Sequence, residues 1–247
     1  MFLFYLHYCF PSLIKRLFRE LVHPVIGEVW QLHRVSDVHS VQERLRVYEI
    51  TPERLESLIV EYIEKGYEFL PVKDVAGRMS GGKGKPFVCV TLDDGYADNY
   101  DVAYPIFRKY SIPFCIYVCE KMVSGERKED DVENYRMLTT EQIRLLDKDS
   151  LCTIGSHTRS HVRLASHPAA RQMEEIAGCK EWLEALLGHE VEDFAYPYGD
   201  YNSDTVKILC QTGIKRAVAA WGGPVRRNTA DKILYIPRML VTDTSVQ

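Results

Sequence analysis

The sequence has no excess of positive charge and no C-x-x-C pair. Its formal net charge is −4, so no broad basic field attracts nucleic acid, and we expect no nucleic-acid partner. The seven cysteines are odd in number, and several lie in apolar, strand-like runs. That placement is typical of buried, reduced thiols and not of a disulfide framework. It indicates a cytoplasmic protein.

The N-terminus lacks the features of a secretion signal. The apolar run at residues 2–10 is too short to span a bilayer, its basic residues follow it instead of preceding it, and no A-x-A site is present. Residues 12–22 place apolar side chains on one helical face and basic side chains on the other. Two interpretations stay open: a helix docked on the protein, or an interfacial helix that makes peripheral membrane contact.

Internal repeats and low-complexity tracts are also missing. With 46% hydrophobic and 27% charged residues, the chain suits one domain with a sizeable core. Short β-branched runs such as 87–92 and 113–119 alternate with helical patterns such as 51–66 and 168–187. This alternation predicts parallel βαβ units, of which about seven fit. We therefore predict an α/β fold, a distorted (β/α)7 TIM-like barrel.

We expect a single domain over residues 1–247, with an amphipathic extension at 1–25 and the catalytic barrel at 26–247. Local signals support the helices of this plan: Thr139 and Gln142, for example, make a capping box. In barrels of this kind the chemistry lies at the carboxyl ends of the strands. The polar motifs of this chain follow predicted strands.

The first motif is Thr91-Leu92-Asp93-Asp94-Gly95, directly after an apolar strand. Repulsion and burial oppose the ionisation of two adjacent carboxyl groups unless a cation or a proton lies between them. The pair therefore suits one metal ligand and one base. An ordinary Asp-Gly turn is the alternative.

The second motif contains His157 and His161, four residues apart after the strand predicted at 151–155. Histidines at this spacing can face one cation, and a carboxylate completes a mixed nitrogen and oxygen set. Two ordinary loop histidines are the alternative. The third motif, Tyr196-Pro197-Tyr198-Gly199, is a tight turn whose backbone N–H groups can point into a site and bind an oxyanion.

Together the three motifs resemble the polysaccharide deacetylase family, carbohydrate esterase family 4, with its NodB-type domain. The resemblance covers about residues 86–240 and implies a role for each motif residue. Asp93 would be the catalytic base, and Asp94, His157 and His161 would bind a divalent metal: zinc, with cobalt, nickel or iron as alternatives. The backbone of Tyr198 would help to bind the oxyanion.

Departures from the family pattern concern the groups around the base. Leu92 stands where the family usually has phenylalanine, and Ala195 where it has the arginine that orients the base. Arg238 is a candidate replacement. The usual late histidine acid is missing, because no histidine follows His189. Leu32-His33-Arg34-Val35 resembles the leading motif of a permuted branch, the biofilm poly-N-acetylglucosamine deacetylases, which assigns the acid to His33. An ordinary strand-end histidine is the alternative there.

The implied function is a hydrolase that removes the N-acetyl group from an acetylated amino sugar and releases acetate. The substrate would be a polysaccharide, an oligosaccharide or a lipid-linked sugar, and Trp221 could line the sugar pocket or be buried. We expect a protonated His33, held so by a neighbouring carboxylate such as Asp93, to donate to the leaving amine. Two alternatives remain: an amidohydrolase on a small non-sugar amide, and a non-catalytic carbohydrate-binding protein.

Overall fold

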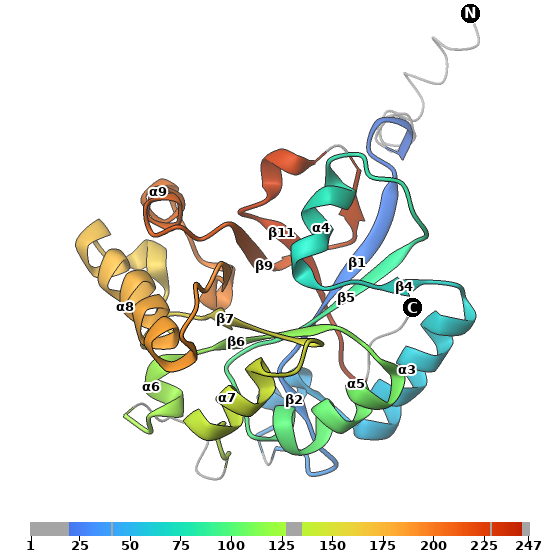
Figure 1. Ribbon diagram of the computed structural model, residues 1–247, viewed down its shortest axis with the longest axis horizontal. Coiled ribbons are helices and arrows are strands. Elements are labelled where there is room, and N and C mark those ends of the chain that lie inside the picture. Colours follow the sequence, from blue (N-terminus) through green and yellow to red (C-terminus); the bar gives the residue numbers. More distant parts are fainter. Residues whose placement is uncertain (1–19, 41, 127–134, 228, 244–247) are drawn as a thin grey trace, which may run out of the picture.

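Seven parallel strands close into a barrel in the computed structural model, which describes residues 20–40, 42–126, 135–227 and 229–243 (Figure 1). The strands lie in the order β1-β11-β9-β8-β7-β6-β5, and β5 pairs again with β1. They are β1 (Val25–Leu32), β5 (Phe87–Leu92), β6 (Phe114–Val118), β7 (Cys152–Ser156), β8 (Asp193–Ala195), β9 (Arg216–Gly222) and β11 (Ile236–Leu240). The predicted fold class is therefore confirmed.

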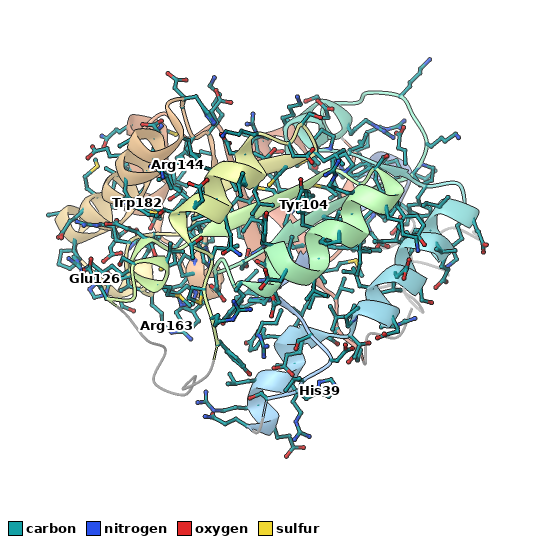
Figure 2. All side chains as sticks on the ribbon, turned by 60° about the horizontal axis from the view of Figure 1, so that its bottom comes forward. His39, Tyr104, Glu126, Arg144, Arg163 and Trp182 are labelled. Atoms are coloured by element: carbon teal, nitrogen blue, oxygen red, sulfur yellow. The ribbon has the colours of Figure 1, made fainter. Side chains whose placement is uncertain are left out.

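Helices surround the barrel. They are α3 (Pro52–Glu64), α4 (Val72–Met79), α5 (Tyr104–Tyr110), α6 (Glu120–Val123), α7 (Thr140–Asp147), α8 (Ala169–Leu187) and α9 (Ser203–Gln211). The capping box predicted at Thr139 is present at the start of α7. Figure 2 labels Tyr104, Arg144 and Trp182 on α5, α7 and α8, three helices of this outer layer.

Short elements complete the chain. Strand β4 (Glu68–Phe69) pairs with the start of β5, and β10 (Val225–Arg226) pairs antiparallel with β1. Strands β2 (Arg34–Val35) and β3 (Glu49–Ile50) form a two-stranded sheet, and the 3-10 helix η1 (Glu43–Tyr48) lies between them in the chain. Further turns are η2 (Asn99–Ala103), a π-helix, and the 3-10 helices η3 (Leu164–Ser166), η4 (Pro197–Gly199) and η5 (Ala230–Lys232).

Both faces of the barrel strands are buried, which explains why these strands have continuous apolar sequences. In β5, Val88 and Val90 pack in one hydrophobic cluster with residues of the surrounding helices, whereas Phe87 and Cys89 pack in another with Tyr117 of β6. Alternate side chains of one strand thus join two cores.

One barrel strand does not have a typical strand sequence. Strand β11 runs from Ile236 to Leu240. Pro237 lies within it, and because proline donates no backbone hydrogen bond, its presence argues against a central strand in the sequence. The residues that follow Pro237 carry an essential part of the site described below.

Different segments of the chain lie at the two ends of the barrel. The carboxyl end of β1 leads to β2, at the bottom of Figure 1, whereas the chain enters β1 from the opposite end. There Arg226 donates hydrogen bonds to the carbonyl of His23 and to the side chain of Glu20.

Most of the extension predicted at residues 1–25, and of the amphipathic segment 12–22, lies outside the described residues. Within the described ranges, none of the helices has the length and apolar character that crossing a membrane requires.

Candidate metal centre and active site

Asp94, His157 and His161 converge at the carboxyl end of the barrel. One ligand atom from each lies within 4.8 Å of the others, and all three side chains are buried. Asp94 Oδ1 is 3.4 Å from His157 Nε2 and 3.3 Å from His161 Nε2. The structure thus brings together the three residues that the sequence singled out as metal ligands.

Unusual backbone conformations bring the site residues together. Of the five described non-glycine residues with positive φ, four belong to the site: Asp94 (φ 73°), Thr158 (69°), His161 (51°) and Tyr198 (58°). Such conformations are uncommon for residues with a Cβ atom and concentrate where function requires them. Here they turn the chain sharply after β5, β7 and β8, so that side chains from three strands face one point.

The donor set fits a divalent cation. His157 Nδ1 lies 2.8 Å from the Ala195 carbonyl and His161 Nδ1 lies 3.1 Å from Tyr198 Oη, so each ring directs Nε2 toward Asp94. Asp94 Oδ1 is buried and has no hydrogen-bond partner among the described residues. Two neutral imidazoles and one carboxylate suit zinc, cobalt, nickel or iron.

Asp93 is held in a different way from its neighbour. Arg238 donates to both of its oxygens at 2.7 Å, and Gln31 donates to Oδ2 at 2.9 Å. Burial alone would raise the pKa of Asp93, but the charges of Arg238 and His157 outweigh that effect and lower it to about 2. The carboxylate is therefore ionised at neutral pH, as a base must be.

Arg238 supplies the arginine that the family pattern leads one to expect beside Asp93. It projects from β11, is 1% exposed, and makes a bidentate pair with Asp93. Ala195, where the arginine was expected from the family pattern, instead offers only its carbonyl to His157. An arginine from a strand that is distant in sequence thus reaches the same carboxylate.

His33 follows β1 and lines the pocket, but it is not hydrogen-bonded to the base. Its Nε2 lies 3.9 Å from Asp93 Oδ2, its Nδ1 is buried without a hydrogen-bond partner among the described residues, and its ring packs on Tyr48 with centroids 4.8 Å apart. Burial lowers the pKa of His33 although Asp93 and Asp94 act to raise it. Desolvation of the buried ring thus acts against the protonated form of His33 that we expected a neighbouring carboxylate to stabilise.

A pocket of about 450 Å³ opens above these groups. Asp93, Asp94 and the two triad histidines lie in its lining, and aromatic side chains line it too. Trp221 is 58% exposed and Tyr198 38% exposed. Trp221 is therefore a pocket residue and not a buried one, and a flat aromatic surface beside a polar floor suits a sugar ring.

Three buried carboxylates support the walls of this site and were missed in the sequence. Glu175 of α8 accepts hydrogen bonds from the backbone and side chain of Ser160, at 2.8 and 3.0 Å. Glu120 of α6 makes a bidentate pair with Arg159. Glu49 accepts from Arg34 at 2.9 Å and from Tyr135 at 2.9 Å. No local motif marks these residues, because their partners come from distant segments.

Comparison with known proteins agrees with this geometry. The family model described as polysaccharide deacetylase matches residues 80–217, more than half of the chain. The matched segment contains Asp93, the metal-binding candidates and Tyr198, but neither His33 nor Arg238.

Two curated relatives are similar in sequence. YxkH of Bacillus subtilis (strain 168), named provisionally as a polysaccharide deacetylase, is 29% identical over 178 residues, which cover 71% of this chain and 60% of YxkH. The poly-beta-1,6-N-acetyl-D-glucosamine N-deacetylase of Staphylococcus aureus (strain MRSA252) is 24% identical over 217 residues, covering 84% of this chain and 73% of that protein. The chain thus spans less than two thirds of the length of YxkH.

Two solved structures have the same fold. IcaB from Ammonifex degensii superposes with a TM-score of 0.77 at 26% identity, covering 89% of this chain and 93% of that one. The deacetylase PplD of Streptococcus pyogenes, solved in complex with acetate, gives 0.75 at 24% identity, covering 88% and 92%.

Proposed function

The chain belongs to the polysaccharide deacetylase family, and we propose that it is a metal-dependent N-deacetylase of an acetylated amino sugar. One observation carries the proposal: three buried ligand atoms converge within 4.8 Å beside an arginine-bound carboxylate, on the floor of an open, aromatic-lined pocket. Asp94, His157 and His161 would hold the metal. A divalent cation bound there supplies Lewis acidity toward an amide carbonyl and toward water.

In the proposed reaction Asp93 takes the proton of the attacking water. Arg238 and Gln31 hold both of its oxygens, which orients the carboxylate and keeps it ionised. The backbone N–H of Tyr198, in a turn of positive φ, would bind the oxyanion that forms as the carbonyl is attacked.

His33 then gives a proton to the departing amine. Because its pKa is lowered in the free protein, His33 must gain this proton during turnover. Asp93 Oδ2 is 3.9 Å from His33 Nε2, so the proton removed from water has only a short distance to travel between the two side chains. The products are acetate and a free amino sugar.

The substrate class follows from the pocket and the relatives. A mouth lined by exposed aromatic rings leaves room for sugar units on either side of the acetylated one. The Staphylococcus aureus relative is named for poly-beta-1,6-N-acetyl-D-glucosamine. We propose N-acetylglucosamine in an oligomer or polymer as the substrate of this chain.

Acetate release from a panel of acetylated sugars tests the proposal. The panel includes β-1,6- and β-1,4-linked N-acetylglucosamine oligomers and simple non-sugar acetamides, each measured with chelator and after metal is restored. We expect release from one of the sugars, loss with chelator, and recovery with zinc or cobalt. Release from the acetamides alone would favour the small-amide alternative, and metal binding without release from any compound would favour a binding protein.

Substitutions assign the metal site. His157→Ala or Asp94→Ala should lower bound metal to background and abolish acetate release. His189→Ala is the matched control, since His189 lies outside the pocket and bonds Asp147. A fully metal-loaded and active His157→Ala protein would refute the assignment.

A further inference from the structure

The side chain of Tyr198 contacts a metal-binding residue, whereas the sequence assigned only the backbone of Tyr198 to the site. Tyr198 Oη is 3.1 Å from His161 Nδ1, and the two rings lie with centroids 4.6 Å apart and planes 54° apart. The hydroxyl thus meets the ring nitrogen of His161 that does not face Asp94.

The two histidines of the site are supported differently. His157 Nδ1 donates to the carbonyl of Ala195 at 2.8 Å, a backbone group that no substitution removes. The Nδ1 of His161 instead bonds a side-chain oxygen, the hydroxyl of Tyr198, which a single substitution can delete. The chain therefore offers an internal comparison between a backbone support and a side-chain support.

From this geometry, and resting on the proposed metal-dependent function, we infer that Tyr198 is a positioning residue for the metal. Its hydroxyl oxygen accepts the Nδ1 proton of His161, which fixes the tautomer with Nε2 unprotonated and holds the ring toward Asp94. Groups that accept a hydrogen bond from a metal-binding histidine orient the ring and raise its basicity.

The Tyr198 ring is held in place for this task. The turn is closed by Gly199 N bonding the Tyr196 carbonyl at 2.9 Å, and it gives Tyr198 a left-handed conformation (φ 58°, ψ 10°). The guanidinium of Arg163 lies over the Tyr198 ring, 4.3 Å from its centroid. The backbone turn and the Arg163 contact restrict the ring, which reduces the side-chain entropy that the bond to His161 costs.

One residue thereby joins two parts of the site. The phenol of Tyr198 orients a metal ligand, and its backbone N–H is proposed to bind the oxyanion. A shift of the turn would displace both groups together. The metal and the oxyanion donor are therefore set at a fixed spacing by a single residue.

Tyr198→Phe tests the inference, because it keeps the ring and the backbone and removes only the hydroxyl. We expect the affinity for Zn²⁺ or Co²⁺, measured by competition with a chelator, to fall by about 10–100-fold. The metal concentration that gives half-maximal acetate release should rise by the same factor. Tyr201→Phe is the matched control: Tyr201 packs on Tyr196 and Tyr235 and does not line the pocket, so its affinity should match the wild type.

Imidazole NMR of the zinc-loaded protein gives a readout independent of turnover. The Nδ1 proton of His161 should exchange faster with water in Tyr198→Phe, while that of His157 stays as in the wild type. Equal metal affinity in Tyr198→Phe and wild type, or an unchanged His161 signal, would overturn the inference and leave the proposed function intact. A wild-type protein that binds no metal would instead contradict the proposed function itself.

Discussion

Asp93 and Asp94 are neighbours in the chain, yet their surroundings give them different chemistry. Asp93 meets a guanidinium and an amide, both fixed donors. The Oδ1 atom of Asp94 lies 3.4 and 3.3 Å from two histidine nitrogens and has no hydrogen-bond partner among the described residues. A positive φ at Asp94 turns the second carboxylate away from the first. The different roles proposed for the two carboxylates rest on these different surroundings.

Asp93→Asn should remove the base and keep the metal site. Proton abstraction is lost while Asp94, His157 and His161 are untouched, so turnover should fall by about 10²–10⁴-fold. Bound metal should stay equal to the wild type. The melting temperature should drop, because Arg238 loses a buried charged partner. Turnover at saturating metal, with the metal content measured on the same sample, checks this. Wild-type turnover in a metal-replete variant would exclude Asp93.

His33→Phe tests the acid. Phenylalanine fills the space against Tyr48 but carries no proton, so turnover should fall by about 10²–10⁴-fold with metal content unchanged. His39→Phe serves as control: His39, labelled in Figure 2, is half exposed and bonds Glu49 outside the proposed chemistry. If both variants kept wild-type rates, the acid would have to be another group.

At the scale of residues, the sequence predicted the site residues that belong to short local motifs. Asp93, Asp94 and His157 each directly follow an apolar strand, and that position alone placed them at one end of a barrel. Arg238 could be proposed as the partner of Asp93, but its strand could not be predicted, because Pro237 lies within that strand. Glu175 could not be found at all, since its importance depends on how α8 packs against the loop after β7.

Among the elements, the loop after β7 depends most on contacts with neighbouring elements. Thr158 and His161 both have positive φ, and the segment between them is bound by a residue of helix α8. The Glu175 carboxylate binds Ser160, and its backbone carbonyl accepts from Arg159 N at 3.1 Å. Helix α8 thus offsets the backbone strain of the loop that carries the two histidines.

Glu175→Ala should destabilise both the fold and the metal site. It leaves the backbone N–H and the hydroxyl of Ser160 without their buried acceptor, so the free energy of unfolding should fall by about 1–3 kcal/mol. Metal affinity should fall as well. Glu174→Ala, one residue away on the exposed side of the same helix, should change stability by no more than about 0.5 kcal/mol. Urea titrations of both variants make the comparison, and Glu175→Gln keeps it possible if Glu175→Ala does not fold.

The ends of α7 and α8 are joined by a pH-dependent contact. His189 Nε2 is 2.9 Å from Asp147 Oδ2, and the bond of its Nδ1 to the Glu190 carbonyl together with Asp147 raises the pKa of His189. A raised histidine pKa stabilises the fold below the unfolded value, and this stabilisation is lost as pH rises through the folded value. Because His189 is half exposed, the gain is at most about 1 kcal/mol.

His189→Ala should therefore lower the melting temperature at pH 5.5 and change it little at pH 8.5. Thermal unfolding of wild type and variant at both pH values measures the difference. A larger effect at pH 8.5 than at pH 5.5 would contradict the assigned sign.

At the scale of the whole molecule, the alternation of strands and helices was enough to predict the barrel. What it could not predict is where the barrel closes. Closure depends on β5 pairing with β1 along six residues, and β1 and β5 are separated in the chain by two α-helices, the 3-10 helix η1 and three short strands. Pairing between such distant segments leaves no local sequence pattern.

Membrane contact through residues 12–22 remains a proposal, and vesicles can test it. Leu17→Glu with Phe18→Glu interrupts the apolar face of this segment, so cosedimentation with anionic lipid vesicles should fall to background. Acetate release from a soluble oligomer should not change, because the segment precedes the barrel. Equal vesicle binding by variant and wild type would argue for a helix docked on the protein.

The entry of the chain and the mouth of the pocket lie at opposite ends of the barrel. Strand β1 spans eight residues, so at about 3.3 Å per residue and with the usual tilt the two ends stand roughly 20–25 Å apart. A protein tethered to a surface through its first residues would hold its mouth outward, at that stand-off. Sugars lying flat on the anchoring surface would be out of reach, and polymer segments that project from it would be processed. The tether would then select substrates by their distance from the anchoring surface as well as by their chemistry.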